Sequence, residues 1–231
     1  RNNMAITSAL AATFVQRAVC QGVPLLYGST GEIITEKSGN LNLGIPGIMY
    51  VGAISGVIGS FLYENSLESF RDMNDFLAII IPLACSILGS AVMGLIYAFL
   101  TTTLRANQNV TGLALTTFGT GFGNFFGASL VKLTGAEVPS VALTHTSKVF
   151  RATLFGNVKG DLAKVFLSYG FLAYMSIIVA IIAAIVLKKT RVGLNLRAVG
   201  ENPATADAAG INVTRYKYLS TIVGSIIAGL G

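Results

Sequence analysis

Apolar runs long enough to cross a bilayer recur along the whole chain, and this pattern restricts its possible folds more than any other feature. A spanning helix needs about 20 mostly apolar residues. Six stretches approach this length, at roughly 5–28, 43–63, 76–101, 110–131, 166–187 and from near 218 to the end. Only 11% of the residues are charged, whereas soluble domains carry about 25%. We therefore predict one all-α, multi-pass membrane domain over residues 1–231, with about six spans.

Basic residues and tyrosines gather at the ends of the apolar runs. A net charge of +6 would raise the question of nucleic-acid binding in a soluble protein. Here the lysines and arginines stand where membrane proteins carry topology signals, so we exclude nucleic acid as a partner and expect membrane lipid instead. Tryptophan is absent, so tyrosines near the span ends are expected to form any belt at the membrane surface. These are Tyr27, Tyr50, Tyr63, Tyr97, Tyr169 and Tyr218.

The charges of the connections assign them to the two sides of the membrane. The connection 64–75 is acidic, whereas 102–109 and 188–217 are basic. The positive-inside rule places the two basic connections in the cytoplasm and the acidic one outside. Alternation then puts 29–42 inside and 132–165 outside, where a long connection tolerates its several basic residues.

The segment 31–56 joins the first two apolar runs but is not expected to form one regular helix. It holds Gly44 and Pro46, and proline removes a backbone donor while glycine loosens the chain. Irregular backbone at membrane depth persists only if it is buried in protein or lines a wet cavity. One interpretation is a broken segment that enters a translocation pathway through Asn40, Asn42 and Gly44. The other is an ordinary cytoplasmic turn, and spacing alone does not separate the two.

The segment 105–124 is rich in amides, threonines and glycines inside an otherwise apolar region. Small residues at helical spacing let helices pack closely, and threonine hydroxyls bond across them, so tight packing is the commoner explanation. The alternative is a polar face that lines a pathway for an uncharged, hydroxylated solute. Its candidate residues are Asn107, Gln108, Thr111, Thr117 and Thr120. No predicted span has an acid at its centre, which disfavours an ion-coupled carrier.

Residues 200–210 contain the start and stop signals of one short helix inside the basic segment. Asn202 is a suitable cap and Pro203 a suitable first helical residue. Four alanines follow and favour the helix, and Gly210 ends it. One or two turns are too short to span a membrane and too weak to stand alone. We therefore favour a helix that docks on a partner over a solvated loop.

Patterns of catalysis or metal binding are not found in the sequence. There is no Walker-type glycine-rich loop followed by lysine and serine or threonine. His145 has no nearby cysteine, histidine or carboxylate cluster in the sequence, and we expect it to be a solvated surface residue. We expect this chain to have no catalytic residue, no metal ion and no cofactor of its own.

The sequence resembles a known protein family in three blocks that occur in order over nearly the whole chain. The blocks are GEIITEKSGNLNLGIPGIMYVGA, RANQNVTGLALTTFGTGFGNF and TRVGLNLRAVGENPATADAAGINV. They resemble the inner-membrane permeases of bacterial ABC importers, in the subgroup for branched-chain amino acids, simple sugars and nucleosides. The first two blocks look most like the nucleoside permeases that depend on a basic membrane protein.

The resemblance implies a fold, a location and a set of partners. The fold is a type II-importer-like helical bundle with a broken second segment, crossing the bacterial cytoplasmic (inner) membrane several times. The partners are a cytoplasmic ATPase that uses the ATP, a second and non-identical permease subunit, and an extracytoplasmic solute-binding lipoprotein. A nucleoside is the expected substrate. Simple sugars or branched-chain amino acids are alternatives, and a channel or ion-coupled carrier is the alternative of another class.

The resemblance also assigns the coupling to the ATPase to part of the cytoplasmic loop 188–217. The coupling residues are Gly200, Glu201, Asn202, Pro203, Ala206, Ala209 and Gly210. Many relatives carry glutamate at the position of Pro46, within an NxGxEG pattern, and its replacement here weakens any role for that position. The chain begins at Arg1 without a methionine and ends at Gly231 inside an apolar run, so we interpret it as a fragment whose last span is cut.

Overall fold

The computed structural model describes residues 2–66, 74–134, 143–153 and 166–231, and every regular element in these ranges is helical. The predicted all-α class is therefore confirmed. The elements in chain order are α1 (Asn2–Glu36), α2 (Ile45–Ser66), α3 (Asp75–Ala98), the π-helical turn η2 (Phe99–Thr103), α4 (Gln108–Thr134), α5 (Thr144–Arg151), α7 (Phe171–Lys189), α8 (Arg191–Glu201), α9 (Pro203–Ala208) and α10 (Val213–Leu230).

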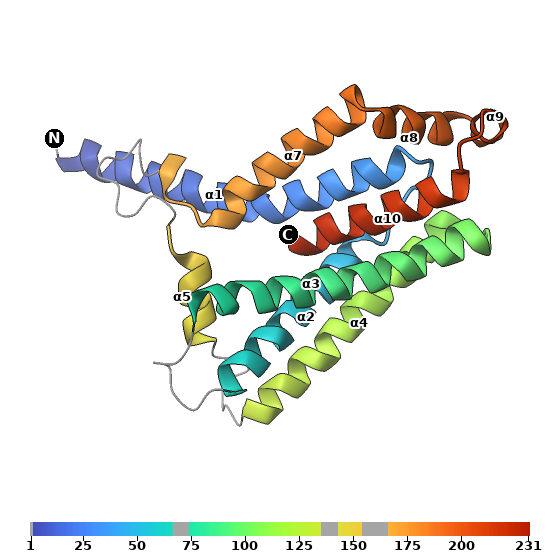
Figure 1. Ribbon diagram of the computed structural model, residues 1–231. Coiled ribbons are helices and arrows are strands. Elements are labelled where there is room, and N and C mark those ends of the chain that lie inside the picture. Colours follow the sequence, from blue (N-terminus) through green and yellow to red (C-terminus); the bar gives the residue numbers. More distant parts are fainter. Residues whose placement is uncertain (1, 67–73, 135–142, 154–165) are drawn as a thin grey trace.

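Long helices packed side by side form the centre of the fold (Figure 1). α2 packs against both α3 and α4, α10 packs against α3 and α1, and α7 packs against α1. Their shared core consists of apolar side chains from α2, α3, α4 and α10, namely Ile45, Ile48, Val51, Met93, Tyr97, Leu115 and Ala228. This core begins at the first residue of α2, so it supports the point where the chain enters that helix.

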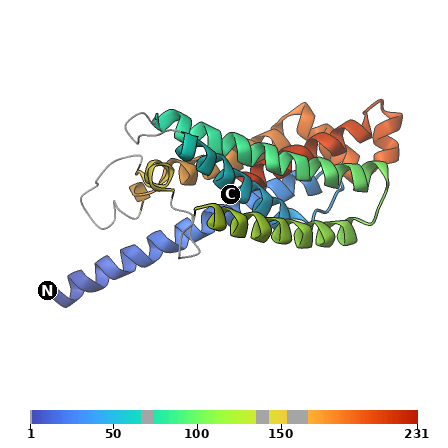
Figure 2. The ribbon, with the colours of Figure 1, turned by 90° about the horizontal axis from the view of Figure 1, so that it is seen from below.

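The helices follow the predicted apolar runs in order but differ from them in extent. Among the described residues, α2, α3 with η2, and α7 are long and apolar enough to cross a membrane, and the count of six spans stays a prediction. α1 continues to Glu36 instead of ending near residue 28. Gly28 lies inside this helix and packs closely on α2, since a Cβ atom there would lie only 2.9 Å from Met49 Sδ. The first half of α1 extends beyond the other helices (Figures 1 and 2).

The connections meet in two groups at opposite ends of the bundle. At one end, Gln108 Nε2 donates to the Gly39 carbonyl oxygen at 3.2 Å, which joins the two connections predicted to be cytoplasmic before α7. At the opposite end, the Glu64 carboxylate accepts from the backbone N–H of Thr146 at 2.7 Å, which joins two connections predicted to lie outside. This grouping agrees with the alternation deduced from charge.

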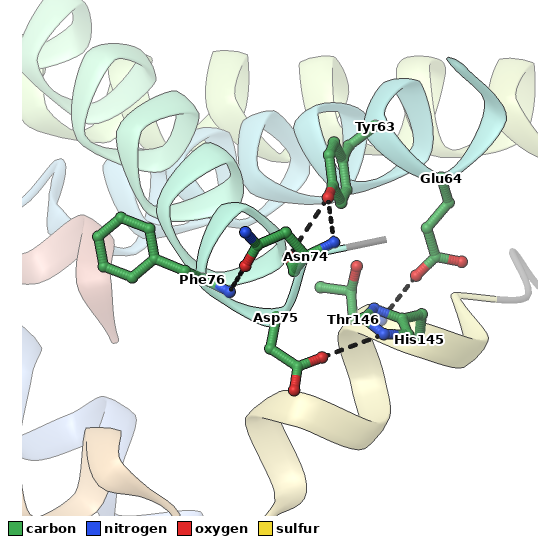
Figure 3. Close-up of polar contacts among 7 residues, drawn as sticks. All are labelled: Tyr63, Glu64, Asn74, Asp75, Phe76, His145 and Thr146. Atoms are coloured by element: carbon green, nitrogen blue, oxygen red, sulfur yellow. Dashed lines mark hydrogen bonds and ion pairs between the residues drawn. The ribbon is translucent and has the colours of Figure 1, made fainter. Parts of the chain in front are cut away.

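The predicted outer end contains α5, a helix that the sequence did not indicate (Figure 3). It lies against the ends of α2 and α3, where His145 Nε2 is 3.2 Å from Asp75 Oδ1. The His145 side chain is only 18% exposed, so the expectation of a solvated histidine is wrong. The sequence could not indicate this contact, because Asp75, the first residue of α3, is 70 positions away from His145 and approaches it only in the folded protein.

Most of the tyrosines expected at the membrane surface are buried instead. Tyr27, Tyr63, Tyr97 and Tyr169 are between 0% and 8% exposed. Buried tyrosine hydroxyls usually find a hydrogen-bond partner, and here Tyr27 donates to the Leu172 carbonyl oxygen of α7 at 3.0 Å. The belt prediction is therefore wrong for these four side chains, which bury their rings between elements.

Two glycines allow close approach at the contact between α2 and α4. A Cβ atom on Gly47 would lie 2.4 Å from the Leu115 carbonyl oxygen, and one on Gly119 would lie 2.3 Å from the Gly47 carbonyl oxygen. Neither position has room for a side chain. The tight helix packing expected from the glycines of α4 is thus present at Gly119.

We expect Gly119→Val to destabilise the protein by about 1–3 kcal/mol, the usual cost of overpacking. Gly121→Val is the matched control, because a Cβ atom at Gly121 meets no atom within 4 Å. Thermal unfolding in detergent compares the two variants. Equal midpoints would contradict the close approach of α2 and α4.

Candidate functional site

The connection between α1 and α2, residues 37–44, is irregular, and exposed and buried residues alternate along it. After α1 ends at Glu36, the chain turns at Gly39. The φ of Gly39 is +83°, in the left-handed region that glycine adopts readily. Asn40 and Asn42 are 1% and 2% exposed. One side of the connection therefore faces into the protein and the other side is exposed. The buried side is enclosed by protein, as irregular backbone at membrane depth requires.

Side chains from α1, α3 and α4 hold this connection in place. Glu32 Oε1 accepts from the Asn42 backbone N–H at 2.8 Å, and Gln108 Oε1 accepts from the Leu41 N–H at 2.8 Å. Tyr97, which is fully buried, donates its hydroxyl to the Leu41 carbonyl oxygen. Three helices thus satisfy backbone groups that an irregular segment would otherwise leave without partners.

Asn40 extends this network to α10 and η2. Its Nδ2 donates to Thr221 Oγ1 at 3.3 Å and to Thr102 Oγ1 at 3.4 Å. Within the described residues, Glu32 Oε2 and Asn42 Nδ2 are buried without a hydrogen-bond partner, which leaves one acceptor and one donor unused. We refer to these side chains together as the polar node: Glu32, Asn40, Asn42, Tyr97, Thr102, Gln108 and Thr221.

The pathway candidates from the second block fall at two separate places. Gln108 belongs to the polar node, and the buried Thr111 lies on the same first turn of α4. Gly44 packs beside them, since a Cβ atom there would lie 3.3 Å from the Gly112 carbonyl oxygen. Asn107 caps α4, and its Oδ1 accepts from the N–H groups of the second and third residues that follow it.

Thr117 and Thr120 lie further along α4, away from the node. Thr117 is exposed and lines an open groove of about 670 Å³ together with Phe118, Phe122 and Phe125. The Thr120 hydroxyl donates within its own helix, to the carbonyl oxygens of Thr116 and Thr117 at 3.0 Å. Thr117 therefore faces a space where a solute or another chain could lie, whereas Thr120 does not line it.

α9 has the cap and the stop that the sequence predicts. Asn202 Oδ1 accepts from the Thr205 N–H at 3.1 Å, Pro203 is the first helical residue, and Gly210 has a φ of +81°. Of the seven predicted coupling residues, Gly200 is half-buried, Ala206 is 3% exposed and the others are exposed. Most of the surface of α9 is therefore free within the described chain.

α8 was not predicted, and its presence corrects the description of 188–217 as a loop. Thr190 caps it by accepting from the Gly193 N–H at 3.1 Å, and Leu196 and Val199 are buried. The helix carries α9 at its end, where Asn202 closes one helix and starts the next. The basic segment is thus a two-helix arm fixed by one apolar face.

Sequence reasoning missed four members of the node, namely Glu32, Tyr97, Thr102 and Thr221. Each bonds to a residue at least 10 positions away, so no local motif links them. The one available signal was a carboxylate at Glu32 next to a segment of irregular backbone. Among the described residues, no three His, Cys, Asp or Glu side chains are placed to hold a metal ion.

Comparison with known proteins gives a consistent set of relatives. Residues 14–231 match the family described as branched-chain amino acid transport system / permease component. The putative glucose ABC transporter permease protein TsgC13 of Haloferax volcanii is 30% identical over 226 residues, which cover 95% of this chain and 61% of that protein. No solved structure matches the chain.

Two further relatives are named as nucleoside or guanosine permeases. The nucleoside ABC transporter permease protein NupC of Lactococcus lactis subsp. cremoris is 30% identical, and the guanosine ABC transporter permease protein NupQ of Bacillus subtilis is 28% identical. Each match covers 94% of this chain and 65% of the relative. The chain thus spans less than two thirds of the length of these relatives, but its own family match is nearly complete. It belongs to the family of branched-chain amino acid transport system permease components.

Proposed function

We propose that this chain forms the membrane pathway of an ATP-driven ABC importer for nucleosides in the cytoplasmic membrane. A partner ATPase hydrolyses the ATP, a second and different permease subunit completes the pathway, and an extracytoplasmic lipoprotein delivers the solute. The relatives named for nucleosides and guanosine support the substrate, at 27–30% identity.

The observation that carries the proposal is the exposed surface of α9. A helix of six residues is too short to be stable alone, and here it is held at its first turn by a cap and at Ala206 by burial. Its remaining side chains lie open at the end of the bundle predicted to be cytoplasmic. A preformed helix presented in this way fits a docking element for an ATPase.

Alternating access would follow from movement of this arm. Closure of the ATPase would push α8 and α9, and the packing of α2, α3, α4 and α10 around the polar node would change. The node supports this role because its hydrogen bonds join the connection 37–44 to α10 and α4. Two of its buried polar atoms, Glu32 Oε2 and Asn42 Nδ2, have no hydrogen-bond partner within the described chain. The groove beside Thr117 supports a place for the solute, since aromatic faces and a hydroxyl suit a nucleobase and its ribose.

Uptake measurements in cells that express the whole transporter test the substrate. We expect labelled uridine to accumulate, and unlabelled uridine or guanosine to compete, while ribose and leucine do not. Competition by ribose would favour a sugar permease, in line with the name of the Haloferax relative, and competition by leucine would favour a branched-chain amino acid permease. Either result would contradict the nucleoside proposal.

A further inference from the structure

The arm formed by α8 and α9 meets the connection 37–44 through two glycines. Gly200 lies in the last turn of α8, and Gly39 follows α1. A Cβ atom on Gly200 would lie 2.4 Å from the Lys37 carbonyl oxygen and 3.1 Å from the Gly39 nitrogen. One on Gly39 would lie 3.3 Å from Gly200 Cα. The two backbones therefore touch without a side chain between them.

Each side of this contact is fixed to a different part of the molecule. On the α8 side, Val199 is fully buried, and Asn202 starts α9 two residues after Gly200. On the other side, the Gly39 carbonyl oxygen accepts from Gln108, and the next residue, Asn40, reaches α10. A displacement of α9 would thus pass to the polar node through one helix and one backbone contact.

We propose that the Gly39–Gly200 contact is the joint through which α8 and α9 reposition the polar node. Backbone packed on backbone has no flexible side chain to absorb a displacement, and close-packed interiors transmit strain. Gly200 was among the predicted coupling residues, but it is half-buried against Lys37 and Gly39. We therefore treat both glycines as positioning residues that act on the connection 37–44 and do not touch the solute or the ATPase. The proposal rests on the proposed function, because it assigns one step of the coupling to an ATPase.

Gly200→Ala in the full-length transporter, assembled with its ATPase, tests the joint. The added methyl group must separate the two backbones, so we expect assembly and basal ATP hydrolysis to persist while solute taken up per ATP falls at least about tenfold, a usual size for coupling between sites. Gly22→Ala is the matched control, because it also lies in a helix and its Cβ atom would meet no atom within 4 Å.

The outcomes separate the joint from the transport function itself. If Gly200→Ala takes up as much solute per ATP as the unaltered protein, the joint proposal is overturned. This holds even if the rates of uptake and of ATP hydrolysis both fall by the same factor. Absence of ATP-dependent uptake in the unaltered protein overturns the proposed function instead.

A distance measurement keeps the proposal testable even if Gly200→Ala does not assemble. Lys37 and Glu201 flank the contact and are both exposed, so spin labels can be attached there after Cys20 and Cys85 are replaced. We expect the distance between the labels to stay the same in the nucleotide-free and ATP-bound states, because the joint moves as one unit. A distance that changes with nucleotide would show that the two segments slide apart, and would overturn the proposal.

Discussion

Gly210→Asp should abolish uptake while the protein still folds and inserts into the membrane. A Cβ atom at Gly210 meets no atom within 4 Å, so the new side chain starts in open space. It does place a carboxylate on the surface proposed to receive the ATPase. Leaving one charge buried and unpaired at an interface costs about 3–5 kcal/mol, whereas about 1.4 kcal/mol already lowers affinity tenfold.

Two companion variants separate docking from local strain. Gly210→Ala shares the left-handed backbone, which costs about 1–2 kcal/mol for a residue with a side chain, but it adds no charge and should keep substantial uptake. Deletion of residues 203–209 removes α9 and should abolish uptake as Gly210→Asp does. Co-purification of the ATPase together with solute uptake measures each effect. Normal uptake by either Gly210→Asp or the deletion of 203–209 would contradict the proposal that α9 docks on the ATPase.

Thr117→Trp should lower solute uptake by at least about tenfold, equivalent to about 1.4 kcal/mol, without reducing the amount of ATPase bound. Thr117 is exposed in the groove beside three phenylalanines, and its hydroxyl donates only to the Leu113 carbonyl oxygen of its own helix. An indole ring there would fill space that the solute is proposed to cross. The expected change is therefore in transport and not in folding.

Thr117→Ser and Thr120→Val are the matched controls for the groove. Serine keeps the hydroxyl and removes one methyl group, so uptake should remain near that of the unaltered protein. Thr120 does not line the groove and its hydroxyl bonds along its own helix, so Thr120→Val should have little effect. Unchanged uptake kinetics in Thr117→Trp would instead assign this face of α4 to helix packing or lipid.

The elements that could be predicted are those whose signals are local. The cap at Asn202 and the stop at Gly210 act within α9 itself, and both are present as expected. The apolar runs likewise gave the order of the long helices, because each run is contiguous in the sequence. The end of α1 was misplaced because the prediction followed the apolar run, which stops near residue 28, whereas the helix continues to Glu36.

The remaining parts depend on contacts between distant residues. Gln108 was chosen for its place in an amide-rich segment, but its bond to Leu41 exists only because α4 lies beside the α1–α2 connection. Tyr97 was assigned to the membrane surface because it ends an apolar run, yet it is buried against that connection. α8 had a usable signal in Val192, Leu196 and Val199, which share one helical face, but two glycines within the segment obscured it.

The most direct test of transport driven by a partner ATPase is uptake by the full transporter in which only the ATPase is replaced, by a variant that binds ATP without hydrolysing it. ATP then binds but is not hydrolysed, while this chain is unaltered. We expect accumulation of labelled uridine to fall to background, with the complex still assembled. Accumulation that persists at the unaltered rate would contradict the account and indicate a channel or an ion-coupled carrier.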